Sequence, residues 1–145
     1  MSLDSLRIEF PYLRFSKNDE FRPFIPISIH YKKGTERTLA LLDSGADFTF
    51  IPLKIARRVG LSLSPKRVRE VHGVGGTIEA FMTHATLIFF LGEKQEFVLN
   101  KVPVLIPNDE NFNYTLLGRD SIFNEFIISF DEYDKKVTFE KKSIN

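Results

Sequence analysis

Short runs in which apolar and polar residues alternate dominate this chain, and they predict strands rather than long helices. Apolar positions alternate from Ile25 to Ile29 within residues 24–31, and residues 32–35 then have the composition of a turn. Three glycines, Gly73, Gly75 and Gly76, mark the tip of a hairpin formed by residues 68–81. The other strands are expected at residues 37–42, 48–51, 86–91, 96–99, 102–106, 127–130 and 137–140, with Gly92-Glu93-Lys94 as the turn of a second hairpin.

Helix signals are confined to two short segments. Residues 52–59 begin with Pro52, are followed by Gly60 and carry two arginines in the last turn, where positive charge suits the helix dipole. Asp120 is expected to cap a second helix over residues 121–125. Many short strands joined by turns, with one or two short helices, predict an all-β fold built as a closed or nearly closed barrel.

The composition is that of one globular domain. The 145 residues are enough for a single core, and 43% hydrophobic with 27% charged residues is ordinary. Phenylalanine is frequent, at 15 copies, which indicates either a core or an apolar groove lined by rings. The net charge of +1 gives no electrostatic reason to expect nucleic acid as a partner, and a solvated face explains the basic stretch 54–69.

Missing residue types exclude several other classes of site. The chain has no cysteine, so disulfides, cysteine nucleophiles and thiolate metal sites are excluded. His30 and His84 lack the spacing of metal ligands, and we expect neither a metal nor a cofactor. We see no signal peptide and no apolar run of the roughly 20 residues that span a bilayer, and therefore expect no membrane segment in this chain and a cytoplasmic location.

Asp43 is the first candidate for chemistry because it directly follows the apolar residues 39–42. A carboxylate at the end of a buried strand is costly unless it is hydrogen-bonded. Ser44 and the nearby backbone could supply such bonds, and Gly45 permits a tight turn or the close approach of another backbone. Taken alone, the segment is explained equally well by a turn aspartate between two strands.

Three motifs taken together are more specific than Asp43 alone. Residues 41–50 (Leu-Leu-Asp-Ser-Gly-Ala-Asp-Phe-Thr-Phe) are followed by the glycine-rich residues 71–78 and then by Leu-Leu-Gly-Arg-Asp at residues 116–120. In this order and spacing, residues 24–130 resemble the retroviral-type, or retropepsin-like, single-domain aspartic proteases. The resemblance implies a closed acid-protease barrel with one lobe per chain, and the activity of an aspartic endopeptidase.

The resemblance assigns roles to the residues of the first motif. Asp43 matches the catalytic carboxylate, and Ser44 matches the hydroxyl that ties two active-site loops together. Gly45 and Ala46 match the segment that binds the substrate backbone. Asp47 matches a carboxylate that contacts the substrate main chain.

The two later motifs receive roles in the same way. Gly73, Val74 and Gly75 match the tip of a flap over the substrate, although a plain hairpin tip also explains these glycines. Arg119 matches the arginine that pairs with Asp47, a pairing that suits a purely structural role as well as substrate binding. His72 replaces a glycine that is common in viral flaps; it either titrates near neutral pH and alters flap mobility or is an ordinary exposed residue.

The number of active-site aspartates predicts an assembly. This chemistry needs two carboxylates about 3 Å apart that share one proton. The sequence Asp-Ser-Gly or Asp-Thr-Gly occurs only once, so the second carboxylate is expected from Asp43 of another copy across a two-fold axis. The expected function is hydrolysis of a peptide or protein substrate by a homodimer. The alternative is a catalytically silent module that binds an extended peptide or partner by strand addition.

The two ends of the chain depart from the viral pattern. Residues 127–140 are expected to form a full hairpin where the retroviral enzymes have one terminal strand, and residues 1–23 precede the region of resemblance. We therefore divide the chain into an N-terminal extension (1–23), a protease domain (24–141) and a C-terminal tail (142–145). The resemblance leaves open which strands form the dimer interface.

Overall fold

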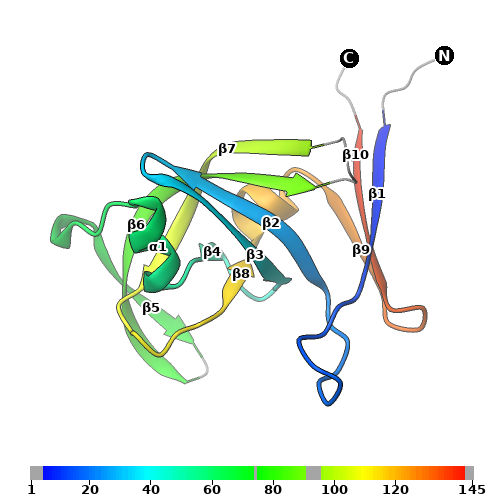
Figure 1. Cartoon of the computed structure of the whole chain (residues 1–145), viewed down its shortest axis with the longest axis horizontal. Helices are drawn as coiled ribbons and strands as arrows, with labels where there is room; N and C mark the ends of the chain where they lie inside the picture. Colours follow the sequence, from blue (N-terminus) through cyan, green and yellow to red (C-terminus); the bar gives the residue numbers. More distant parts are fainter. Residues whose placement is uncertain (1–4, 74, 91–95, 143–145) are drawn as a thin grey trace.

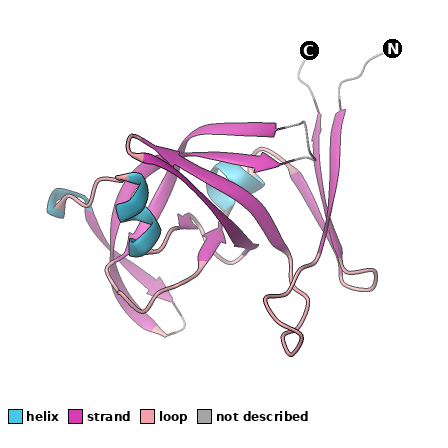
Figure 2. Ribbon diagram, in the orientation of Figure 1, coloured by secondary structure: helices cyan, strands magenta, loops and turns pink. Residues whose placement is uncertain are grey.

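A computed structural model describes residues 5–73, 75–90 and 96–142, and strands make up most of this part of the chain (Figures 1 and 2). In chain order the strands are β1 (Ser5–Pro11), β2 (Phe24–Tyr31), β3 (Gly34–Leu42), β4 (Thr49–Phe50), β5 (Val68–Gly73), β6 (Gly76–Phe90), β7 (Glu96–Pro107), β8 (Thr115–Leu117), β9 (Ile127–Asp131) and β10 (Lys136–Lys142). The helical elements are α1 (Leu53–Val59), η1 (Pro65–Arg67) and η2 (Arg119–Phe123).

Within the described residues the larger sheet closes into a barrel. Its strands follow the order β2-β3-β8-β4-β7-β6-β5, and β2 also pairs with β6, so that β5 alone lies outside the closed ring. Most neighbours are antiparallel, but β3 pairs with β8 and β4 with β7 in parallel. The prediction of an all-β closed barrel with short helices and one lobe per chain is therefore confirmed.

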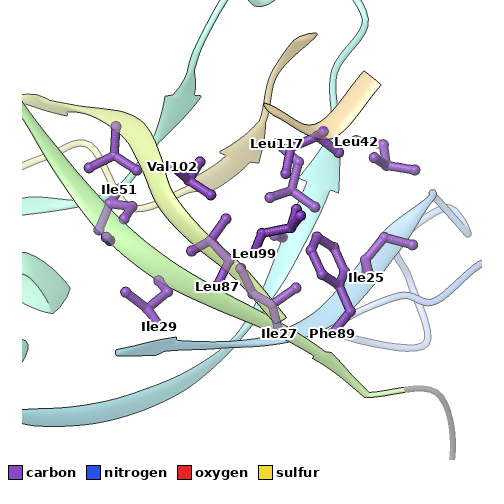
Figure 3. Packing of buried hydrophobic residues seen from close by; sticks show 14 of the residues in the cluster. Ile25, Ile27, Ile29, Leu42, Ile51, Leu87, Phe89, Leu99, Val102 and Leu117 are labelled. Atoms are coloured by element: carbon purple, nitrogen blue, oxygen red, sulfur yellow. The ribbon is translucent and has the colours of Figure 1, made fainter. Parts of the chain in front are cut away.

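The alternation along β2 explains its place in the barrel. Ile25, Ile27 and Ile29 are at most 1% exposed and point into the interior, where they meet Leu87 of β6 and Leu99 of β7 (Figure 3). Burying each side chain of this size contributes roughly 1.5–3 kcal/mol relative to leaving it exposed. The centre of the hydrophobic core lies here, inside the ring of strands.

Helix α1 forms close to where the sequence predicts it. Pro52, with φ −63° and ψ 148°, stands immediately before the helix, and Gly60 ends it in the left-handed region at φ 80°. The buried side chains of the helix, among them Ala56 and Val59, pack against the barrel core. The exposed face of the helix carries Arg57.

A second, three-stranded sheet has the order β1-β10-β9 and stands beside the barrel (Figure 1). It confirms the predicted C-terminal hairpin, but β1 was not predicted, and it pairs with β10 along its whole length. Phe10 of β1 lies 5.4 Å from Phe139 of β10, and Phe126 lies 5.2 Å from Phe139 and 5.0 Å from Phe97 of β7. These rings join the small sheet to the barrel. The division at residues 23 and 24 stays a prediction, although residues 5–11 share the core of the rest.

Two predicted strand boundaries are wrong. Strand β6 runs without interruption from Gly76 to Phe90, and β7 runs from Glu96 to Pro107, where separate shorter strands were expected. The pairing of β6 with β7 shifts between Ala85 and Leu87, and Lys101 on β7 has φ 54°. A bulge of this kind bends a strand without ending it, so a local break in the alternation was misread as a boundary. The predicted turn at residues 92–94 lies outside the described residues.

The helix predicted over residues 121–125 is present only as an irregular turn, and its predicted start and cap are wrong. The helical turn η2 spans Arg119–Phe123, and non-helical dihedrals interrupt it at Asp120 (ψ 129°) and Ser121 (φ 68°). The Asp120 carboxylate accepts a hydrogen bond from Ser121 Oγ at 2.9 Å, where a capping bond from a backbone N–H was expected. The backbone N–H of Asp120 donates to the carbonyl of Asp47, so this residue is held by tertiary contacts and does not start a regular helix.

Candidate active site

Asp43 directly follows the carboxyl end of β3, and backbone hydrogen bonds hold it in a fixed position. Leu42 pairs with Leu117 of the parallel strand β8, and the Asp43 N–H donates to the carbonyl of Leu117 at 3.0 Å. The Asp43 side chain is half-buried, and its Oδ1 accepts a hydrogen bond from the Gly45 N–H at 2.9 Å. This backbone donor holds the orientation of the carboxylate.

The loop that follows Asp43 is interlocked with residues 118–120. The Ala46 N–H donates to the Asp43 carbonyl at 3.1 Å, and the Ala46 carbonyl accepts from the Arg119 N–H at 2.8 Å. Gly118 lies against this loop so closely that a Cβ there would overlap the backbone of Phe48. Two of the three sequence motifs therefore meet in one rigid arrangement.

The side chains of Asp47 and Arg119 form an ion pair across these two motifs. Both side chains are well exposed, at 70% for Asp47 and 59% for Arg119, so solvent screens the pair and its contribution to stability is small. Exposure leaves the Asp47 carboxylate accessible to a ligand. Ser44, the remaining residue of the first motif, is exposed beside Asp43.

The segment that was predicted to form a flap is the hairpin of β5 and β6, and its paired ends are Gly73 and Gly76. Gly76 has φ 114°, a conformation that favours glycine, and Gly75 is exposed next to it. His72 and Thr77 face each other across the hairpin, with 2.9 Å between Nδ1 and Oγ1. Val74, predicted at the tip, lies outside the described residues.

A cavity of about 450 Å³ separates the Asp43 loop from strand β5. Its walls come from the Asp43 loop and from β4, β5, β7 and β8, namely Asp43, Gly45, Ala46, Asp47, Phe48, Phe50, Glu70, Val71, His72, Gly73, Leu105 and Leu116. The structure thus brings together Asp43, Gly45, Ala46, Asp47 and Gly73 of the predicted site. In the described residues no group of three or more potential ligands is placed to hold a metal ion.

The apolar part of the cavity was not predicted. Phe48, Phe50, Leu105 and Leu116 were not named as site residues, although they line the cavity. Phe50 pairs with Leu105 and with Leu116 because β4 lies between β7 and β8. The alternation of apolar residues directly after Asp43 was the available signal for the two phenylalanines. Leu116 begins the motif at residues 116–120 but was given no role in the site, and nothing local in the sequence marks Leu105.

A comparison with protein families decides the assignment. The family model described as aspartyl protease matches residues 26–121, which include the Asp43 loop, the β5–β6 hairpin and residues 116–120. The chain belongs to the aspartyl protease family. The resemblance to the retropepsin-like proteases that the sequence motifs indicated is thereby confirmed. No curated protein sequence matches this chain.

A comparison with solved structures shows which known folds are similar to the fold of this chain. A crystal structure of a retropepsin-like aspartic protease from Rickettsia conorii matches with a TM-score of 0.60, 12% sequence identity, and coverage of 99% of this chain and 98% of the other. An EIAV protease complexed with the inhibitor HBY-793 is 25% identical over 75% of this chain and 92% of its own, with a TM-score of 0.49. The first match, at low identity, shows a fold shared over 99% of this chain.

In the part of the chain that the structure describes, no helix is a candidate for crossing a membrane. None of its helical elements combines the length and the hydropathy that a bilayer span requires.

Proposed function

We propose that this member of the aspartyl protease family is an endopeptidase, active as a homodimer with Asp43 of each copy in one catalytic site. The observation that carries the proposal is the position of the Asp43 carboxylate. It is oriented by the Gly45 N–H and lies in the wall of a cavity of about 450 Å³, opposite the flap residues His72 and Gly73. An immobilised carboxylate beside a cleft of this volume is suited to acid–base chemistry on a bound chain.

The need for a second copy follows from the single active-site aspartate. General acid–base hydrolysis of an amide by carboxyl groups needs one ionised and one protonated group at the same bond. The only Asp-Ser-Gly sequence of the chain contains Asp43. A two-fold axis beside Asp43 would supply the partner group without any further residue. In the aspartic-protease pattern the exposed Ser44 hydroxyl would join the two loops below the pair.

In the proposed reaction, one Asp43 carboxylate removes a proton from a water molecule as its oxygen bonds to the scissile carbonyl carbon. The protonated Asp43 of the other copy donates its proton to the carbonyl oxygen, and a neutral tetrahedral diol results. Collapse of the diol breaks the C–N bond, with one proton passing to the leaving nitrogen and one returning to the pair. The products are a carboxylic acid and an amine, and the two Asp43 side chains again share one proton.

The substrate is proposed to lie extended between the Asp43 loop and the flap. Gly45, Ala46 and Asp47 line the cavity from one side and Gly73 from the other, and all four offer groups that suit a peptide main chain. Val74 and Gly75 would complete the flap contact at the hairpin tip. The apolar wall formed by Phe50 and its neighbours favours large apolar side chains in the substrate.

Replacing the catalytic carboxylate tests the proposal directly. The wild-type chain and Asp43→Asn are compared for cleavage of a diverse peptide library between pH 3 and 7, with sedimentation to establish the dimer. We expect loss of cleavage by at least 10³-fold, since the amide of an asparagine cannot act as an acid or base here, with fold and dimer retained. Asp134→Asn, at an exposed turn position, serves as the charge-matched control.

The outcomes separate the two candidate functions. Cleavage by the wild type that disappears in Asp43→Asn supports the protease. A wild-type dimer that binds peptides but cleaves none of them would favour the catalytically silent module. Undiminished cleavage by Asp43→Asn would refute the role of Asp43.

A further inference from the structure

The loop of residues 13–22, between β1 and β2, exposes two aromatic side chains. Phe15 is 63% exposed and Phe21 is 46% exposed, although phenylalanine is among the residues most often buried. Figure 1 shows this loop in blue, projecting from the lower edge of the molecule away from the strands. Two exposed rings on one loop make this loop a candidate contact surface.

The two rings are held in place within the loop. The guanidinium of Arg14 lies 4.4 Å from the centroid of the Phe21 ring, and its Nη1 donates to the carbonyl of Lys17 at 3.0 Å. The Phe15 ring packs edge-on against Phe24, with 4.7 Å between the centroids, and Phe24 is buried. A fixed pair of aromatic rings with an arginine is the composition that dominates the energetic centre of protein interfaces.

The base of the loop is joined to the strand that carries Asp43. Leu13 and Arg22 form a bridge across the loop, and the Pro23 carbonyl then accepts from the Leu42 N–H at 3.1 Å. Leu42 directly precedes Asp43 in the chain. Since paired strands are about 5 Å apart and each residue advances about 3.4 Å, the base of the loop lies within roughly 10 Å of Asp43.

We propose that the loop 13–22 is a contact surface for the second copy of this chain, with Phe15 and Phe21 as its anchors. The inference rests on the proposed homodimer and identifies part of its interface. If two Asp43 carboxyl groups approach to about 3 Å, the two-fold axis passes between them. Residues close to Asp43 and outside the substrate cavity are then close to the axis and face the partner.

The position of the loop distinguishes it from the other exposed apolar side chains. Val98 lies on β7 and Ile127 and Phe130 lie on β9, and in the described residues neither strand pairs with β3. The loop 13–22 combines two exposed phenylalanine rings with a base that is linked, through the Pro23 carbonyl, to the residue before Asp43. Two copies of the loop around one axis would bury four phenylalanine rings.

The experiment measures the dissociation constant of the dimer by sedimentation over a range of concentrations, together with peptide cleavage at the same concentrations. For Phe21→Ser we expect a dissociation constant at least tenfold higher than in the wild type. The maximal rate per dimer at high protein concentration should be unchanged, because Phe21 does not line the cavity. Phe15→Ser should act in the same direction but also loses the packing on Phe24, so Phe21→Ser is the cleaner variant.

Val98→Ser is the matched control, since Val98 is 45% exposed and Phe21 is 46% exposed. It should leave the dissociation constant within twofold of the wild type. An active wild-type dimer whose dissociation constant is unaffected by both phenylalanine substitutions would overturn this inference and leave the proposed function standing. A wild-type dimer that cleaves no peptide would instead refute the protease, while a weakened Phe21→Ser dimer would still support the contact. A strictly monomeric wild type would refute both.

Discussion

The buried hydroxyl of Thr49 accepts a hydrogen bond from the backbone N–H of Gly118 at 3.3 Å, joining two motifs that are distant in the sequence. Thr49 is fully buried, and Gly118 is buried against the Asp43 loop. A buried N–H without a partner costs about 1–3 kcal/mol. This bond therefore helps to hold Arg119 and Asp120 against the loop that presents Asp43.

Removing the acceptor from Thr49 should destabilise the protein. Thr49→Val keeps the shape of the side chain but leaves the Gly118 N–H unpaired, so we expect the free energy of unfolding to fall by about 1–3 kcal/mol. Urea denaturation followed by circular dichroism measures the change. Thr49→Ser retains the hydroxyl and should keep the hydrogen bond, although it loses a buried methyl group. Equal stability of Thr49→Val and wild type would show that the bond contributes nothing.

Gly118 is required by space as well as by hydrogen bonding. A Cβ at this position would overlap the Phe48 backbone, so Gly118→Ala must displace the loop between Asp43 and Thr49. We expect a loss of roughly 1–3 kcal/mol or more in the free energy of unfolding, the usual cost of inserting atoms into a packed site, and loss of any peptidase activity. The matched control is Gly75→Ala, where an added Cβ meets nothing within 4 Å. If Gly118→Ala were as stable as Gly75→Ala, the proposed overlap would be wrong.

The sequence was sufficient where the signal is local. Asp43, Asp47 and Gly73 were predicted as site residues from short motifs, and they line one cavity because the strands before the two motifs, β3 and β5, belong to the same seven-stranded sheet. The alternation in residues 24–31 identified β2, since its inward side chains recur at every second residue within one short segment. Whether the cavity residues act in catalysis remains a prediction.

The sequence was insufficient where the pairing is between distant segments. Leu105 reaches the cavity through its pairing with Phe50, which no local pattern encodes, and the motif that contains Leu116 does not reveal that Leu116 also pairs with Phe50. Strand β1 had a usable signal, because Leu6, Ile8 and Phe10 alternate with charged residues, but its partner β10 lies at the other end of the chain. The charged residues of that segment were used only as evidence against a signal peptide, and their alternation with apolar residues was not used.

A salt bridge on the surface should be visible in a carboxyl titration. Arg57 of α1 donates to both carboxylate oxygens of Glu110, at 3.0 and 2.6 Å, and these hydrogen bonds hold the pKa of Glu110 below its ordinary value. The stabilisation by this pair is present above the unfolded pKa and is lost as the pH falls through the lower, folded pKa. Arg57→Ala should return the Glu110 pKa toward its ordinary value, as measured by NMR of the carboxyl carbon.

The matched control for this titration is Arg58→Ala. Arg58 lies next to Arg57 on the same helix but pairs with Glu36, so its removal should leave the Glu110 pKa unchanged. The same response in both variants would show that general positive charge, and not the two hydrogen bonds, lowers the pKa. The result also matters for the cavity, because Phe112 of the same loop packs 6.1 Å from Phe50.

Tyr12 makes the stability of the protein sensitive to alkaline pH. Its side chain is 3% exposed, and burial, followed by the nearby Glu132 carboxylate, raises the pKa from 10.0 to about 12. Between these two pH values the unfolded chain releases the phenol proton while the folded chain retains it. The free energy of unfolding is therefore unaffected by this group below pH 10 and falls by about 1.4 kcal/mol per pH unit above it.

Tyr12→Phe should remove this dependence, since it deletes the titrating group and keeps the ring. Urea denaturation at intervals from pH 8 to 12 gives the difference in unfolding free energy between wild type and variant. We expect that difference to be constant up to pH 10 and then to shift in favour of the variant as the wild type loses stability. Because all other tyrosines, lysines and arginines are common to both proteins, their titration cancels in the comparison. Parallel curves over the whole range would mean that Tyr12 ionises as readily in the folded protein as in the unfolded chain, and that its burial does not hinder ionisation.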